Sequence, residues 1–113
     1  MRDLKFRAWR KDNDPRMIEW RYILLAGLKT YLNDDYALMQ YTGLLDKQSK
    51  EIYESDRVRT PAGIGIVKWD RCFRLFWNDK DSTTLHDCQE KNLEVIGNIY
   101  ENPNLLVKIG GVS

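Results

Sequence analysis

The chain has 113 residues, of which 42% are hydrophobic and 31% charged, and its formal net charge at pH 7 is +1. This length predicts a single domain over residues 1–113 with a modest core, and the balance of residue types excludes a disordered chain. No apolar run reaches the roughly 18 residues that a membrane helix needs, so we expect no membrane association.

The N-terminal stretch MRDLKFRAWRKD is charged throughout and lacks the apolar segment of a secretory signal. The two cysteines, Cys72 and Cys88, form neither a C-x-x-C pair nor a disulfide framework. Together these features predict a cytoplasmic protein with two reduced thiols.

Residues 4–9 alternate between apolar side chains and a basic or aromatic set, which is the pattern of a half-buried strand. A polar segment rich in turn-forming residues follows, and residues 17–23 alternate again, with Ile18, Trp20 and Tyr22 on one face. Two strands around a short polar loop predict a β-hairpin.

Leu24, Leu28 and Leu32 recur every four residues, which predicts a short helix with one apolar stripe within residues 23–36. Gly27 costs such a helix up to about 1 kcal/mol. Residues 37–43 predict a short extended segment, and residues 44–53 predict a polar turn between two apolar arms.

The pattern of strands is clearest from residue 56 onward. Residues 56–60, 64–69 and 72–77 predict strands, and Pro61 to Gly63 predicts the first turn between them. Gly65 inside the second strand predicts a bend or bulge. Residues 78–92 predict a long polar loop with a helical turn, and residues 93–100 predict the last strand.

The segment after the last strand has the signals of a helix start. Asn102 suits an N-cap and Pro103 suits the first helical position, where a missing N–H is not needed. We expect Leu105 and Leu106 to fold back on the core and residues 107–113 to form a frayed tail.

These segments predict a mostly β (α+β) fold, in which residues 56–77 and the last strand form a small SH3-like barrel. The N-terminal hairpin and short helical segments are added to it. The apolar residues expected to form one shared core are Phe6, Ile18, Trp20, Val58, Ile66, Val95 and Ile99.

The sequence offers no catalytic constellation. His86 is the one histidine and lies in a polar loop, and the adjacent Asp87 and Cys88 point away from it in an extended chain. Cysteine and histidine are too few for a zinc site, and the acidic residues near 79–87 lack the glycine and distal glutamate of a calcium loop. We therefore expect no enzyme, no catalytic residue, no metal and no cofactor.

Residues 57–77 interleave basic and aromatic side chains, as in barrels that stack nucleic-acid bases within a basic groove. The candidate contacts of this basic strip are Arg57, Arg59, Lys68, Arg71 and Arg74. The favoured alternative is that its large apolar residues, Trp69, Phe73, Leu75 and Trp77, form the core.

Trp9 is a separate candidate, because its strand places it with Lys5 and Arg7. Tryptophan and arginine are enriched at binding hot spots, so Trp9 is either a partner-binding anchor or a cap on the barrel edge.

Four stretches, KFRAW, LMQYTGLLDKQSKEIYESD, GIGIVKW and LEVIGNIYENPNLL, closely resemble the YopX family of small phage and prophage proteins. That family usually has Glu-Gly-Asp where this chain has Glu54, Ser55 and Asp56, and a glycine there would allow a positive φ. The resemblance implies a strand-rich domain encoded by a phage and working in the host cytoplasm, and it carries over no catalytic residue.

Two hypotheses for function follow. The first is a non-enzymatic accessory protein that binds a host or phage protein, and the second is a nucleic-acid-binding module that uses the basic strip. Self-association into a homo-oligomer stays open.

Overall fold

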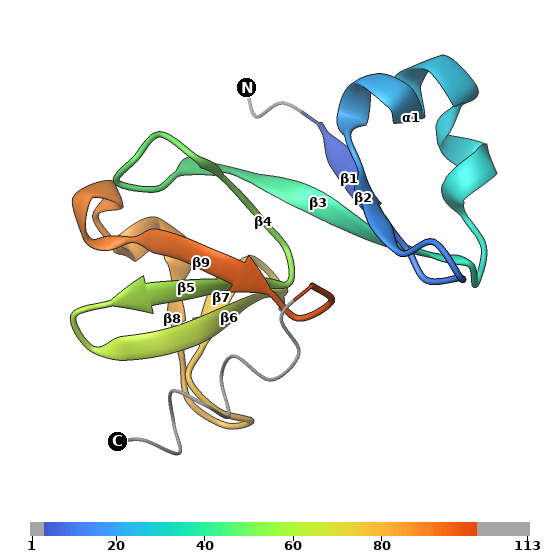
Figure 1. Cartoon of the computed structure of the whole chain (residues 1–113). Helices are drawn as coiled ribbons and strands as arrows, with labels where there is room; N and C mark the ends of the chain where they lie inside the picture. Colours follow the sequence, from blue (N-terminus) through green and yellow to red (C-terminus); the bar gives the residue numbers. More distant parts are fainter. Residues whose placement is uncertain (1–3, 102–113) are drawn as a thin grey trace. The chain divides into compact units, whose positions relative to one another are not determined.

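Strands dominate the structure, a computed structural model that describes residues 4–101 (Figure 1). The mostly β fold class with short helical segments is confirmed. The chain divides into two units, Met1–Tyr41 and Thr42–Ser113. The single domain expected over residues 1–113 stays a prediction.

The first unit contains the predicted hairpin, formed by β1 (Phe6–Arg10) and β2 (Arg16–Ile18). β1 also pairs antiparallel with the first half of β3 (Tyr36–Leu45), so β1 is central and β2 lies at the edge. In the hairpin loop, the Asp12 carboxylate accepts hydrogen bonds from Arg10 Nε at 2.9 Å and from the Asp14 N–H at 3.0 Å.

The strand predicted across Trp20 and Tyr22 is wrong, because α1 (Trp20–Ala26) begins there. The N–H groups of Tyr22 and Ile23 donate to the Glu19 carbonyl at 3.0 and 3.3 Å and start the helix. Trp20 and Ile23 lie three residues apart and share the inward face of α1. A segment this short fits both the two-residue period of a strand and the 3.6-residue period of a helix.

Gly27 ends α1 and does not interrupt it. Its φ is +92°, and its N–H donates to the Ile23 carbonyl at 2.8 Å, which closes the helix as glycine commonly does. A 3-10 turn, η1 (Leu28–Tyr31), follows and leads toward β3.

The second unit is built on an antiparallel five-stranded sheet with the order β8-β7-β6-β5-β9. Its strands are β5 (Asp56–Thr60), β6 (Gly63–Trp69), β7 (Phe73–Phe76), β8 (Ser82–Thr84) and β9 (Glu94–Asn98). The end of β3 and β4 (Glu51–Tyr53) form the predicted arms around a turn, and 3-10 turns η2 (Leu85–Asp87) and η3 (Glu90–Asn92) connect β8 to β9.

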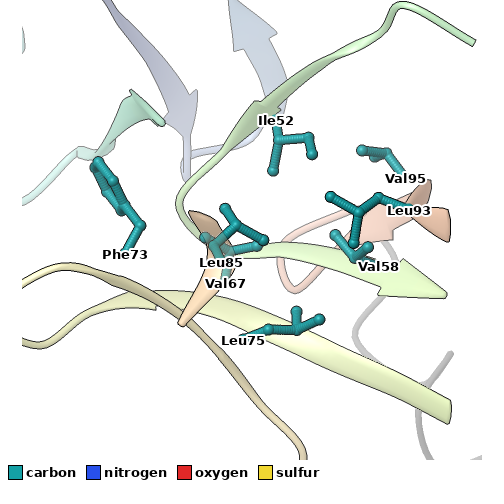
Figure 2. Close-up of a cluster of buried hydrophobic side chains, with 8 residues drawn as sticks. All are labelled: Ile52, Val58, Val67, Phe73, Leu75, Leu85, Leu93 and Val95. Atoms are coloured by element: carbon teal, nitrogen blue, oxygen red, sulfur yellow. The ribbon is translucent and has the colours of Figure 1, made fainter. Parts of the chain in front are cut away.

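The core of the second unit gathers side chains from β4, from the five-stranded sheet and from the segments that join β8 to β9 (Figure 2). Its members are Ile52, Val58, Val67, Phe73, Leu75, Leu85, Leu93 and Val95. Leu44, Trp77 and Cys88 pack against it and are partly buried.

The predicted core is confirmed at Val58 and Val95 and is wrong at Ile66. Val58 pairs with Gly65 across the sheet, so Gly65 and Val67 share the core face and Ile66 lies on the opposite face. The other predicted members, Phe6, Ile18, Trp20 and Ile99, are only half-buried.

Gly65 is needed for close packing of β6 and β7, and it does not form the predicted bend or bulge. The irregular register of this sheet lies between Arg57 and Val58, where β5 meets β9, and not at Gly65. A Cβ atom on Gly65 would stand 2.7 Å from Cγ and 2.9 Å from Cδ1 of Leu75, distances that real Cβ atoms do not reach. The missing side chain therefore lets β7 bring Leu75 against β6.

Ser55 has φ +72°, the left-handed conformation that a glycine at this position would adopt without strain. Its N–H donates to the Val67 carbonyl at 2.8 Å, and its carbonyl accepts from the Ile99 N–H at 3.1 Å. These two bonds tie the β4–β5 turn to β6 and to the end of β9, which fixes the conformation despite its cost.

Asp46, which is buried, joins the β3–β4 turn to β9. Its carboxylate accepts hydrogen bonds from the N–H groups of Gln48, Lys50 and Val95, each at 2.9 Å. Burial acts to raise the pKa of Asp46, but these hydrogen bonds and the charge of Lys50 outweigh it and hold the pKa below its usual value.

The described chain ends in a turn after β9, where Asn98 Oδ1 accepts from the N–H groups of Tyr100 and Glu101 at 3.0 and 2.8 Å. The helical turn predicted from Asn102, the core contacts of Leu105 and Leu106, and the frayed tail at 107–113 lie outside the described residues. Within residues 4–101, no helix has both the length and the apolar character to cross a membrane.

Candidate binding surfaces

The register of β5, β6 and β7 places most of the basic strip on one face of the sheet. Arg57 pairs with Ile66 and Arg59 with Ile64, while Lys68 pairs with Arg74. Ile64, Ile66 and Lys68 are every second residue of β6, so they share the face opposite the core. Residues paired directly across strands lie on the same face, so Arg57, Arg59 and Arg74 lie on it too.

Three of these side chains are buried or bonded to neighbouring residues of the fold. Arg57 is buried, and burial lowers the pKa of its guanidinium. Arg59 Nη1 lies 3.2 Å from Glu94 Oε1 on β9. Arg74 donates from Nε to Ser82 Oγ at 2.8 Å and from Nη1 to Thr84 Oγ1 at 3.0 Å, so it clamps β7 to β8.

Lys68 and Arg71 are exposed at the β6–β7 connection. Lys68 Nζ lies 5.4 Å from the ring centre of Phe76, and Arg71 occupies the turn with φ +67°. Trp69 is also exposed there and meets the ring of Phe73 edge-on at 4.8 Å. The strip therefore exposes Lys68 and Arg71 at this end and Arg59 beside Glu94, while Arg57 is buried and Arg74 is held by β8.

The alternative assignment of the large apolar residues to the core is right for Phe73 and Leu75, which are fully buried, and wrong for Trp69, which is 52% exposed. Trp77 is half-buried and its Nε1 donates to Thr83 Oγ1 at 3.2 Å. Trp9 lies half-buried on the central strand β1, opposite Met17 and Ala37, so its role as an anchor stays a prediction.

The first unit carries an apolar surface that the sequence did not reveal. Its large apolar residues, with their exposed fractions, are Tyr22 (50%), Leu24 (62%), Leu25 (85%) and Leu32 (60%). We call these four residues the α1 surface. Helical geometry turns Ile23, which is fully buried, inward, and leaves the other three α1 members on the solvent side.

A groove of about 460 Å³ adjoins this surface at Tyr22. Its other lining residues are Arg16, Met17, Ile18 and Tyr31. Three of them belong to β2, and no strand within residues 4–101 pairs with the outer side of β2. An exposed strand edge is a template on which a segment of another protein can pair.

Arg21 is the one charged residue of α1, and it interacts with its neighbours in sequence. Arg21 Nε lies 3.1 Å from Glu19 Oε2, and its guanidinium stands 4.9 Å from the ring centre of Tyr22. The solvent side of α1 is therefore mainly apolar, with one salt-bridged arginine.

His86 and Cys88 lie close together in sequence and differ in their surroundings. His86 is exposed on η2, and Cys88 is half-buried with Sγ 3.8 Å from the Thr84 carbonyl oxygen. Burial, and then the charge of Asp87, raise the pKa of the Cys88 thiol, which opposes formation of a nucleophilic thiolate. Among the described residues, no three His, Cys, Asp or Glu side chains gather as metal ligands would.

A family model described as "YopX protein" matches residues 22–107 of the chain. Among solved structures, the chain is similar to the one titled "Crystal structure of protein EF1440 from Enterococcus faecalis". The identity is 21%, the match covers 94% of this chain and 99% of that chain, and the TM-score is 0.61, so this likeness concerns the fold alone. No curated protein matches the chain.

Proposed function

The chain belongs to the YopX family, and on that premise we propose that it is a phage or prophage accessory protein that binds a host or phage protein in the cytoplasm. Its proposed action is non-enzymatic: the α1 surface covers part of the partner and thereby changes what the partner can do. The family match itself names no activity, so the proposal depends on the surface.

The observation that carries the proposal is the exposure of Tyr22, Leu24 and Leu25 on α1 and of Leu32 directly after η1. Burying one such side chain contributes roughly 1.5–3 kcal/mol. Tyr22, Leu24 and Leu25 lie within four residues on α1, and apolar patches exposed on a folded protein commonly mark a protein interface. A partner that covers the α1 surface gains this free energy, whereas a monomer in water does not.

The edge strand beside the surface suggests how a partner engages. A partner segment that pairs with β2 would place its side chains over the groove lined by Met17, Ile18 and Tyr31. Main-chain hydrogen bonds would then supply affinity, and the groove and the α1 surface would supply specificity.

The test compares the wild type with the double variant Leu24→Lys/Leu25→Lys as baits in lysates of infected and uninfected host cells. Leu4→Lys is the matched control, because Leu4 is 68% exposed but lies outside α1 and η1. Substitutions at exposed positions change stability by about 0.5 kcal/mol or less, so all three baits should show the same thermal melt.

The expected result is one or more proteins that are retained by the wild type and by Leu4→Lys and lost from the double variant. If the double variant retains the same proteins in the same amounts, the α1 surface is not the binding site and the proposal fails.

Nucleic-acid binding is the second candidate, and the shared face of Arg57, Arg59, Lys68 and Arg74 is the observation in its favour. It has less support, because Arg57 is buried and Arg74 is held by β8. Titration with single- and double-stranded DNA at two salt concentrations tests it, since phosphate contacts weaken steeply with salt. We expect no salt-sensitive binding.

A further inference from the structure

Two hollows lie next to each other in the second unit, beside the turn that joins β5 to β6. One holds about 250 Å³ and the other about 360 Å³. Thr60, Pro61 and Asn92 line both, so the two hollows share a rim. We call the pair the β5–β6 groove; it is separate in sequence from every residue of the α1 surface.

The smaller hollow is basic. Lys47, Arg59 and Lys91 line it together with Glu94. Lys47 Nζ and Arg59 Nη1 approach the same carboxylate oxygen, Glu94 Oε1, at 3.8 and 3.2 Å. Because exposed ion pairs of this kind contribute about 1 kcal/mol or less, a second carboxylate entering the hollow can share these cations at little cost.

The larger hollow is mainly apolar. Its lining includes Pro61, Trp77, Cys88 and Leu93. Leu93 is fully buried and belongs to the core, and Trp77 and Cys88 pack against that core. The hydrogen bond from Trp77 Nε1 to Thr83 Oγ1 fixes the indole ring, so the floor of the hollow is set before any ligand arrives.

The rim between the hollows is also held in place. Thr60 Oγ1 accepts from the Ala62 N–H at 3.1 Å and donates to the Gly63 carbonyl at 3.0 Å. On the other side, the Asn92 N–H donates to the Gln89 carbonyl at 2.9 Å. A site whose walls are already ordered loses less conformational entropy on binding.

The charges of the groove select among ligands. Three cations, Lys47, Arg59 and Lys91, face two carboxylates, Glu94 in the basic hollow and Asp87 in the apolar one. The excess of one positive charge suits a ligand that carries a single carboxylate. A chain of phosphates would meet a protein carboxylate in each hollow, which disfavours nucleic acid.

We propose that the β5–β6 groove is a docking site for an acidic segment of a partner protein, with an aspartate or glutamate in the basic hollow and a neighbouring apolar side chain in the other. The basic hollow supplies orientation through the carboxylate. The apolar hollow supplies most of the free energy, because a side chain that enters it leaves water for a rigid apolar floor. The chain thereby has a second docking site in addition to the α1 surface.

The test is a selection of displayed random dodecapeptides on the immobilised full chain, followed by fluorescence anisotropy with the enriched synthetic peptide. Enriched peptides should carry Asp or Glu beside Leu, Phe or Trp. Arg59→Gln and Lys91→Gln should each weaken the affinity about fivefold, the loss expected for one exposed ion pair worth about 1 kcal/mol. Ala62 lines the apolar hollow, so Ala62→Asp, which adds a negative charge there, should also weaken the affinity.

Lys50→Gln is the matched control, because Lys50 is an exposed lysine of the same unit that lines neither hollow, and it should bind as the wild type does. The double variant Leu24→Lys/Leu25→Lys should also bind the peptide unchanged. A failure of the groove to bind an acidic peptide is therefore distinguishable from a failure of the proposed function.

Three outcomes would overturn the proposal. They are an absence of acidic residues among enriched peptides, an unchanged affinity in Arg59→Gln and Lys91→Gln, and displacement of the peptide by an equimolar thymidine oligonucleotide. The last outcome would assign the groove to nucleic acid.

Discussion

Replacing Gly65 with alanine should destabilise the second unit through a single steric conflict. The added methyl group would lie 2.7 Å from Cγ and 2.9 Å from Cδ1 of Leu75, and 3.1 Å from the Phe76 carbonyl oxygen. Leu75 is fully buried and cannot swing into solvent. Either its side chain or the separation of β6 and β7 must therefore change.

Overpacking of a core by one methyl group costs about 1–3 kcal/mol. For a chain of this size that corresponds to a fall in Tm of about 4–12 °C. Thermal and urea unfolding followed by circular dichroism measure both quantities. A Tm within about 1 °C of the wild type would refute the assignment of Gly65 to packing.

A double-mutant cycle with Leu75→Ala identifies the cause. Leu75→Ala alone leaves a cavity that costs about 2–5 kcal/mol, and the Gly65→Ala methyl group should partly fill it. The two substitutions should then show a favourable coupling of about 1 kcal/mol or more. Gly63→Ala is the control, since its cost comes from φ +134° with nothing within 4 Å, and it should combine additively with Leu75→Ala.

Two further substitutions probe the turns of the second unit. Ser55→Gly should raise stability by about 0.5–1 kcal/mol in a urea melt, because it removes the strain of φ +72°; a loss of stability would contradict this. Asp46→Asn should cost about 1–3 kcal/mol, since an amide cannot accept all three hydrogen bonds. The folded-state pKa of Asp46 is lowered, so its carboxylate stabilises the fold fully above the unfolded pKa near 4 and progressively less as the pH falls through the folded value. The difference in Tm between wild type and Asp46→Asn should accordingly shrink on acidification, and a constant difference would contradict the assigned role.

Much of the second unit could be predicted because its strands carry a strong local pattern. Residues 56–60 and 64–69 combine β-branched residues with a Pro-Ala-Gly turn, and these signals agree with the final register. β8 was missed because its three polar residues have no apolar pattern. They form a strand by pairing with β7, and Arg74 on β7 donates to Ser82 and Thr84.

The first unit shows a limit of periodicity. Ile18, Trp20 and Tyr22 alternate as a strand would, yet Trp20 and Ile23 also fit a helix, and the Glu19 carbonyl starts α1. Leu24, Leu28 and Leu32 predict one apolar stripe on a short helix within residues 23–36. In the structure, Ile23 is the fully buried residue of α1, and Leu24 and Leu32 are exposed.

Candidate sites were harder to predict than strands, because accessibility depends on residues distant in sequence. Counting charge along residues 57–77 identified a basic strip, but it could not show that Arg57 is buried or that Arg59 meets Glu94, 35 residues later. The β5–β6 groove joins Lys47, Arg59 and Lys91, which no local motif connects.

Photo-crosslinking from position 25 in infected cells tests the central claim most directly. A benzoylphenylalanine in place of Leu25, the most exposed apolar residue of the α1 surface, reacts with whatever covers that surface. We predict one discrete adduct with a host or phage protein, absent when the same group replaces the exposed Lys80. Identical adducts from both positions, or an adduct only between two copies of this chain, would contradict the claim that the α1 surface binds a partner protein.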